Sequence, residues 1–193
     1  MILISSCLIG ENVRYDGGNQ SDVRLKKLID SGKAIHACPE LLGGLLIPRE
    51  PAEIIGGDGF DVWNNAAKVV TISDKDVTDD YKHGAIVTLK ILKKYQCDTV
   101  ILKANSPSCG SQEIYDGNFT GNKKKGVGVA TALLINEGIK VYDENTFFDQ
   151  NHDWNDSTWK VRIENISNGL IYWVALFLIK IIFKIVLIIV WLW

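Results

Sequence analysis

Alternating stretches of apolar and mixed sequence in residues 1–145 predict strands and helices in turn. Short runs of apolar and β-branched residues, typical of buried strands, precede segments whose apolar residues recur at helical spacing. The predicted strands are 1–5, 33–37, 68–72, 99–102 and 139–142, and the predicted helices are 22–31, 78–95 and 126–137. This alternation predicts an α/β fold, with three layers and a mainly parallel sheet.

Two long segments between these elements show no periodic pattern and are predicted to be loops. The first, 38–59, holds three of the four prolines and several glycines, and the second is 103–125. Loops of this length inside a compact domain are commonly functional. The composition of 38–59 is more typical of a shaped wall than of a flexible linker.

The chain changes in character near residue 148. All four prolines precede this point, whereas five of the six tryptophans and a single glycine follow it. The segment 170–193 is almost wholly apolar and long enough to span a bilayer as a helix. Lys180 and Lys184 each cost about 2.5–3.5 kcal/mol at a helix centre, which nearly cancels the apolar gain. We therefore predict a domain, 1–147, and an atypical tail, 148–193. The tail has three open interpretations: a transmembrane anchor, a frameshift or read-through product, or a helix that packs on a partner or on the domain.

Charge and cysteine content exclude several classes of protein. The net charge of −2 and the pI near 5.9 give no electrostatic basis for nucleic-acid binding, and the one basic run, 123–125, is predicted to be a solvated loop. Four cysteines are too few for a disulfide scaffold, and the N-terminus lacks the basic region of a signal peptide. We expect a cytoplasmic domain with reduced thiols. His36 and His83 have no ligand partner at a recognisable spacing and are expected to be structural.

Three cysteines lie in the loops just past predicted strands. Cys7, Cys38 and Cys109 lie in loops rich in glycine, proline or small polar residues. In a parallel sheet such loops open on one edge, so the three thiols can meet. Cys97 lies in a turn at the opposite edge and is expected to be a small buried apolar residue. Three converging thiols suit a [4Fe–4S] cluster with one iron left open, or zinc bound by three cysteines and water. The alternative is three unrelated loop thiols.

Polar residues in the same loops are candidates for catalysis and substrate binding. Glu40 follows Cys38 by two residues and is either a general acid or base near a metal, or a surface carboxylate. Ser106 precedes Cys109 and can offer its hydroxyl or backbone N–H to a cluster or a substrate. The candidates for substrate contact are Arg14, Asp16, Arg49, Lys103 and Ser108. The alternative for Asp16 is that it only forms a turn, because Asp-Gly pairs favour turns. The alternative for Arg49 is that it only pairs with a carboxylate.

The motifs around the three cysteines resemble those of one bacterial family. They are SCLIG with RYDG, then CPELLGGL with PREPAEI, then LKANSPSCG with IYDGNFTG. This ordered set is similar to a family of domains of unknown function whose characterised member is thiouracil desulfurase. The resemblance implies a Rossmann-like α/β domain and a [4Fe–4S] cluster held by Cys7, Cys38 and Cys109. It also implies hydrolytic cleavage of the C–S bond of a thiolated pyrimidine such as 2-thiouracil, with catalytic roles for Glu40 and Ser106.

The implied chemistry agrees with the residue types. Sulfur is a soft ligand that an open iron accepts, and a thiocarbonyl bound through sulfur becomes more electrophilic at carbon. Water can then attack with Glu40 as the base, while Ser106 orients the ring or stabilises developing charge. Two other functions stay open: a non-catalytic iron–sulfur or zinc protein that senses metal or redox state, and a domain tethered to a membrane through 170–193.

Overall fold

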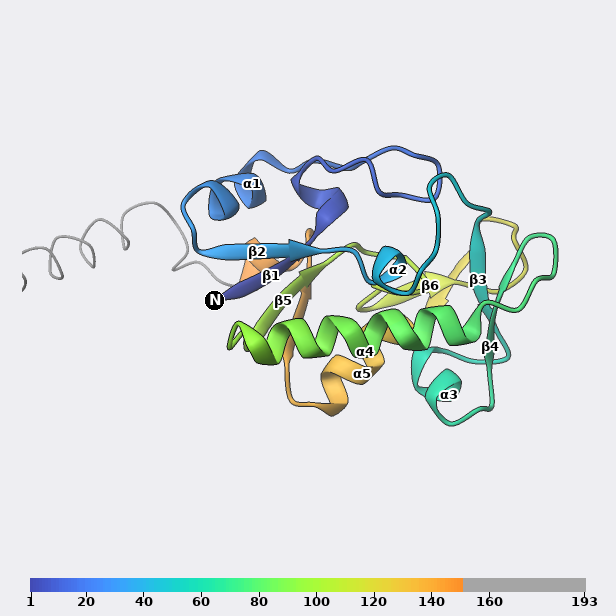
Figure 1. Ribbon diagram of the computed structural model, residues 1–193. Helices are drawn as coiled ribbons and strands as arrows, with labels where there is room; N and C mark the ends of the chain where they lie inside the picture. The colour runs from blue at the N-terminus through green and yellow to red at the C-terminus, as the bar shows by residue number, and fades with distance from the viewer. Residues whose placement is uncertain (151–193) are drawn as a thin grey trace, which may run out of the picture. The chain divides into compact units, whose positions relative to one another are not determined.

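Four parallel strands form the central sheet of the computed structural model, which describes residues 1–150 (Figure 1). The strands are β1 (Ile2–Ser5), β2 (Ala34–Ala37), β5 (Thr99–Leu102) and β8 (Lys140–Asp143). Their order across the sheet is β2-β1-β5-β8. Within the sheet, β2 lies on one side of β1 and β5 lies on the other. The order therefore reverses between β1 and β5, where an open α/β sheet leaves a crevice at its carboxyl edge.

Helices cover both faces of this sheet (Figure 1). They are η1 (Ser6–Ile9) and α1 (Val23–Asp30) on one face, and α4 (Thr78–Lys94) and α5 (Val129–Asn136) on the other. Successive side chains of a strand point to opposite faces. Leu3 and Val100 accordingly pack in one buried cluster with Leu92 of α4 and Leu134 of α5. The prediction of a layered α/β domain with a mainly parallel sheet is confirmed.

The two segments predicted to be loops contain regular structure, so that prediction was wrong. The short elements within these two segments, or next to them in the chain, are α2 (Pro39–Leu42), β3 (Ala52–Ile55), α3 (Gly59–Trp63), β4 (Lys68–Thr71), β6 (Glu113–Tyr115) and β7 (Lys123–Lys125). β3 pairs with β4 and β6 with β7, each antiparallel and apart from the central sheet. The strand predicted at 68–72 is thus real but lies outside the parallel sheet. Elements of three to five residues are too short to show a hydrophobic period.

Two glycines allow α2 to lie directly against α4. A Cβ atom on Gly84 would lie 1.9 Å from the carbonyl oxygen of Pro39, and one on Gly43 would lie 2.1 Å from that of Asp80. No side chain fits at such distances, so both positions require glycine. This contact holds α2, and with it Glu40, beside the N-terminal half of α4.

The described part of the chain ends in α6 (Phe147–Gln150), where the Phe147 ring packs edge-on to Tyr142 with centroids 5.5 Å apart. Within residues 1–150, no helix is long and apolar enough to cross a membrane. The helix predicted at 170–193 and its membrane contact lie outside the described residues. The predicted division into 1–147 and 148–193 therefore stays a prediction.

Candidate metal centre

Three thiols from different loops line one pocket at the carboxyl edge of the central sheet. Cys7 lies in η1 directly after β1, and Cys38 occupies the N-cap position of α2 after β2. Cys109 lies in the turn that follows β5. The pocket has a volume of about 550 Å³, and the three cysteines are free thiols. The fold therefore brings together the three side chains that the strand pattern places on one edge.

Burial keeps these thiols protonated when no positive charge is bound beside them. Burial raises the pKa of Cys7 to about 12, and it also raises the pKa of Cys38 and of Cys109 above the ordinary value. The neighbouring Cys38 and Glu40 raise the pKa of Cys7 further, whereas Lys103 lowers it. Because metals bind the thiolate form, binding at this site must release protons.

The donor set limits what the pocket can hold. A single zinc ion needs three or four ligands around one point. Among residues 1–150, no three His, Cys, Asp or Glu side chains are grouped closely enough to hold one metal ion. A [4Fe–4S] cluster makes a different demand, since each thiolate binds a different iron. Three soft sulfur donors, Cys7, Cys38 and Cys109, around one pocket of about 550 Å³ fit that demand.

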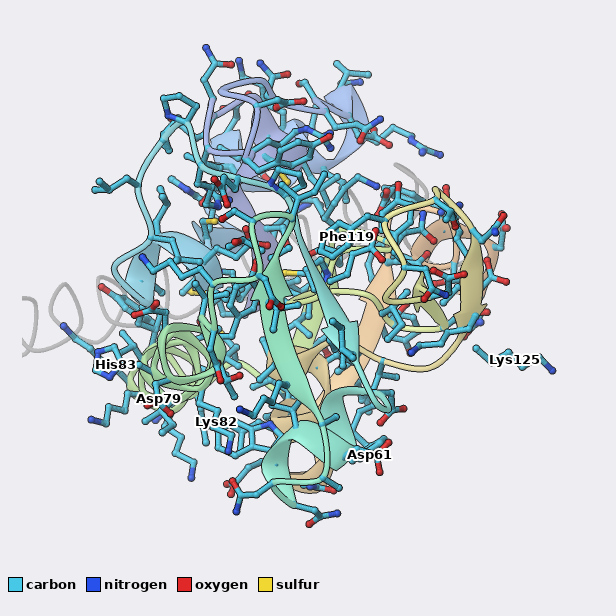
Figure 2. All side chains as sticks on the ribbon, turned by 90° about the vertical axis from the view of Figure 1, so that its right-hand side faces the viewer. Asp61, Asp79, Lys82, His83, Phe119 and Lys125 are labelled. Atoms are coloured by element: carbon cyan, nitrogen blue, oxygen red, sulfur yellow. The ribbon has the colours of Figure 1, made fainter. Side chains whose placement is uncertain are left out.

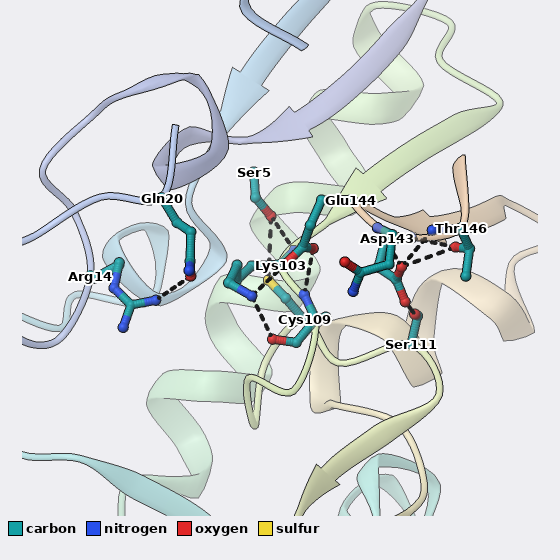
Figure 3. Close-up of polar contacts among 11 residues, drawn as sticks. Ser5, Arg14, Gln20, Lys103, Cys109, Ser111, Asp143, Glu144 and Thr146 are labelled. Carbon is teal, nitrogen blue, oxygen red and sulfur yellow. Dashed lines mark hydrogen bonds and ion pairs between the residues drawn. The ribbon is translucent and has the colours of Figure 1, made fainter. Parts of the chain in front are cut away.

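A chain of polar contacts supports Cys109 (Figure 3). Ser5 Oγ donates to Cys109 Sγ at 3.7 Å and accepts the backbone N–H of Lys103 at 3.1 Å. The Lys103 ammonium lines the pocket but pairs with the Glu144 carboxylate, and both side chains are 15% exposed. Glu144 also accepts the backbone N–H of Ala104 at 2.8 Å. Lys103 thus lies at the predicted site, where Glu144 already balances part of its charge.

Glu40 is fixed at both of its carboxylate oxygens. Its Oε2 accepts hydrogen bonds from the Arg49 guanidinium, one of them from Nε at 3.0 Å, and both side chains are largely buried. Its Oε1 accepts a hydrogen bond from the Ser106 hydroxyl at 3.0 Å. Ser106 Oγ in turn accepts the backbone N–H groups of Ser108 and Cys109 at 3.1 and 3.2 Å. Ser106 therefore links the Glu40 carboxylate to the loop that carries Cys109.

Two predicted substrate-binding residues, Asp16 and Ser108, do not line the pocket. Asp16 lies in an exposed turn, where hydrogen bonds from the backbone N–H of Gly18 and from Arg14 lower its pKa. Arg14 does line the pocket, and it also donates to Gln20 at 3.1 Å (Figure 3). Ser108 is buried, and its hydroxyl has no hydrogen-bond partner among the described residues. Asp16 thus shapes the turn that presents Arg14.

Tyr81 and Glu53 are among the residues of the pocket wall that were not predicted from the sequence. From the sequence, Tyr81 is only part of the apolar face of a helix, and Glu53 belongs to a supposed loop. The structure places both in the wall of the pocket. The buried Glu53 carboxylate accepts the backbone N–H groups of Gly117 and Phe119 at 2.9 and 3.1 Å, which ties the β6–β7 turn to β3. Two features of the sequence could have indicated them. Tyr81 places a phenol on an apolar helix face, and Glu53 places a carboxylate among apolar neighbours.

The residues predicted to be structural lie outside the pocket lining. Cys97 is buried in the apolar cluster under α4, as predicted. His36 contacts the hydroxyl of Ser6 through Nδ1 at 3.1 Å. His83 points outward from α4, and Lys125 projects away from the molecule at the end of β7 (Figure 2). The basic run is therefore a strand with solvated ends and not a loop.

Comparison with known proteins gives concordant matches. The family model described as 2-thiouracil desulfurase matches residues 2–146. The uncharacterized protein YbbK of Bacillus subtilis (strain 168) is 54% identical over 149 residues, which cover 77% of this chain and 99% of that protein. The solved structure of a [4Fe–4S]-dependent thiouracil desulfidase, TudS, matches with a TM-score of 0.69 at 39% sequence identity, covering 77% of this chain and 93% of that one. The family match spans all three pocket thiols, Glu40 and Ser106.

Proposed function

The chain belongs to the 2-thiouracil desulfurase family, and from this premise we propose that it removes sulfur from a small thiolated compound such as 2-thiouracil in a [4Fe–4S]-dependent reaction. The observation that carries the proposal is the single pocket lined by Cys7, Cys38, Cys109 and Glu40. The three cysteines hold the cluster, which when bound supplies an iron without a protein thiolate as the acceptor for the substrate's sulfur. The pocket volume lies within the range of small-molecule sites.

The proposed reaction is a hydrolysis, so it needs no electron donor or acceptor. Water adds to the carbon that carries sulfur, a C–O bond forms and the C–S bond breaks. The products are a carbonyl compound, uracil in the case of 2-thiouracil, and hydrogen sulfide. Glu40 is the base that takes the proton from water. A carboxylate has about four lone-pair sites, and three hydrogen bonds from Arg49 and Ser106 leave one on Oε1 for that water.

Arg49 and Ser106 position Glu40 in this proposal. A serine hydroxyl has one hydrogen and two lone pairs. In Ser106 the hydrogen goes to Glu40, and the lone pairs accept from the backbone of Ser108 and Cys109. We therefore assign Ser106 a positioning role in place of the direct contact with substrate or developing charge expected from the sequence. Arg49 fixes the other oxygen of the same carboxylate.

Anaerobic reconstitution of the full chain tests this function. We expect about four iron and four sulfide per chain. We also expect one sulfide and one uracil to be released for each 2-thiouracil consumed. Uptake of zinc, or an intact cluster without sulfide release, would instead support a metal or redox sensor, which is the alternative function.

We further propose that the domain works in the cytoplasm. All four cysteines are free thiols, and free thiols persist in reducing compartments. Membrane attachment through 170–193 is a separate hypothesis about residues outside the described part of the chain. Fractionation of cells that produce the full chain separates the two locations, because a tethered enzyme would sediment with the membranes.

A further inference from the structure

Tyr81 brings a polar group to the pocket from a buried position. Its ring packs in an apolar cluster with Ile54 and Val69, and the whole residue is only 3% exposed. Tyr81 also lines the pocket, and the charges of Glu40 and Arg49 act on its hydroxyl. The ring is therefore anchored in the core while the hydroxyl reaches the site.

Among residues 1–150, no group forms a hydrogen bond with the Tyr81 hydroxyl. The hydroxyl is therefore open to the pocket, and it is not among the fully buried polar atoms that lack a partner. Phenylalanine would keep the same ring packing, and the hydroxyl makes no hydrogen bond within the described residues, so the fold does not require it. Glu40, Arg49 and Lys103, which share the pocket, all have partners in the protein. A ligand in the pocket is the partner that the Tyr81 hydroxyl lacks.

We propose that the Tyr81 hydroxyl donates a hydrogen bond to a carbonyl oxygen of the substrate, and that the enzyme prefers thiolated heterocycles that carry such an oxygen elsewhere on the same ring. This inference rests on the proposed desulfuration. In 2-thiouracil both ring nitrogens carry hydrogen, so the carbonyl oxygen is its one good acceptor apart from sulfur. Burial raises the pKa of Tyr81, which keeps the hydroxyl a donor. Anchored at both sulfur and oxygen, the ring has one orientation for attack by water.

Replacement of Tyr81 by Phe tests the inference, because it removes the hydroxyl and keeps the ring. Tyr95→Phe is the matched control, since Tyr95 caps the same helix and is 45% exposed. Calorimetric titration of the reconstituted full chain with uracil measures binding without turnover. We expect Tyr81→Phe to bind uracil about tenfold more weakly and to raise the KM for 2-thiouracil by a similar factor, with a smaller change in kcat. Tyr95→Phe should match the wild type.

Pyrimidine-2-thione, which lacks the carbonyl oxygen, provides a second comparison. The wild type should lose about tenfold in kcat/KM on this compound relative to 2-thiouracil, and Tyr81→Phe should lose nothing further. The melting temperature of the reconstituted protein should not fall in Tyr81→Phe, because no hydrogen bond within the described chain is lost. A fall would assign the hydroxyl a structural role and overturn the inference.

The remaining outcomes separate this inference from the function on which it rests. Equal uracil affinity in the wild type and Tyr81→Phe, with sulfide release intact, overturns the inference and leaves the desulfuration standing. A changed absorption spectrum of the cluster with unchanged uracil affinity would place the hydroxyl on the cluster, which also overturns it. A wild type with a full cluster and no sulfide release overturns both proposals.

Discussion

The two ends of strand β5 carry cysteines that are equally buried and chemically unlike. Cys97 precedes the strand and Cys109 follows it, and each is 5% exposed within the same apolar cluster. Cys97 Sγ donates to the carbonyl oxygen of Tyr95 at 3.9 Å and does not line the pocket of the other three thiols. Cys109 accepts a hydrogen bond from Ser5 and shares a pocket with two other thiols. Burial alone therefore does not distinguish the proposed ligand Cys109 from Cys97, whereas position at the carboxyl edge does.

Serine substitution at the two positions tests this contrast most strongly. Cys109→Ser should lose nearly all bound iron and all sulfide release, because two thiolates remain where the cluster needs three. Cys97→Ser should keep both and lose about 1 kcal/mol of stability, because a hydroxyl replaces a buried thiol. Iron and sulfide analysis after anaerobic reconstitution measures the difference. Loss of iron in both variants would contradict the proposal that Cys109 binds the cluster and Cys97 does not.

A second test asks whether the carboxyl edge supplies catalysis as well as ligands. Glu40→Gln keeps the shape of the side chain and removes the base, so the iron content should stay unchanged. The kcat should fall about 100- to 10,000-fold. Glu50→Gln is the control, since Glu50 also lines the pocket but pairs with Ser73 away from the thiols. Steady-state sulfide release measures both variants, and an unchanged kcat in Glu40→Gln would remove Glu40 from the mechanism.

The carboxyl edge could be predicted from the sequence, and the opposite wall of the pocket could not. Cys7, Cys38 and Cys109 each follow a buried strand, and the apolar pattern of such strands is legible without a structure. β3 and β6 span only four and three residues and pair in separate two-stranded sheets. The places of Tyr81 and Glu53 depend on packing between segments distant in sequence, which no local pattern records.

Gly84→Ala perturbs the helix that spans both ends of the sheet. The new Cβ would lie 1.9 Å from the carbonyl oxygen of Pro39, which forces α2 away from α4. Overpacking of this kind costs about 1–3 kcal/mol, and the better helix propensity of alanine offsets up to about 1 kcal/mol of it. Urea denaturation should show the loss. Lys90→Ala, on the exposed face of α4, is the control and should leave the midpoint unchanged.

The smallest expected effect is a pH dependence of the cluster-free protein. The pKa of Cys7 is raised from 9.0 to about 12 in the folded state, so folding favours the protonated thiol. Its contribution to stability is fully present below pH 9 and is lost as the pH rises from 9 toward 12. At pH 10 the wild type should have lost about 1 kcal/mol relative to Cys7→Ser. Urea midpoints at pH 8 and pH 10 measure this, and parallel changes in the two proteins would contradict it.

The separation of the small sheets from the central sheet has a consequence for engineering. β3–β4 and β6–β7 share no strand with the four parallel strands, and Glu53 fastens one hairpin to the other. The three proposed cluster ligands follow strands of the central sheet, whereas Glu53 and Tyr115 of the pocket wall lie in the small sheets. We expect that changes in these small sheets alter the pocket wall while the three proposed ligands keep their places at the central sheet. Engineering for other thiolated compounds should begin in these hairpins.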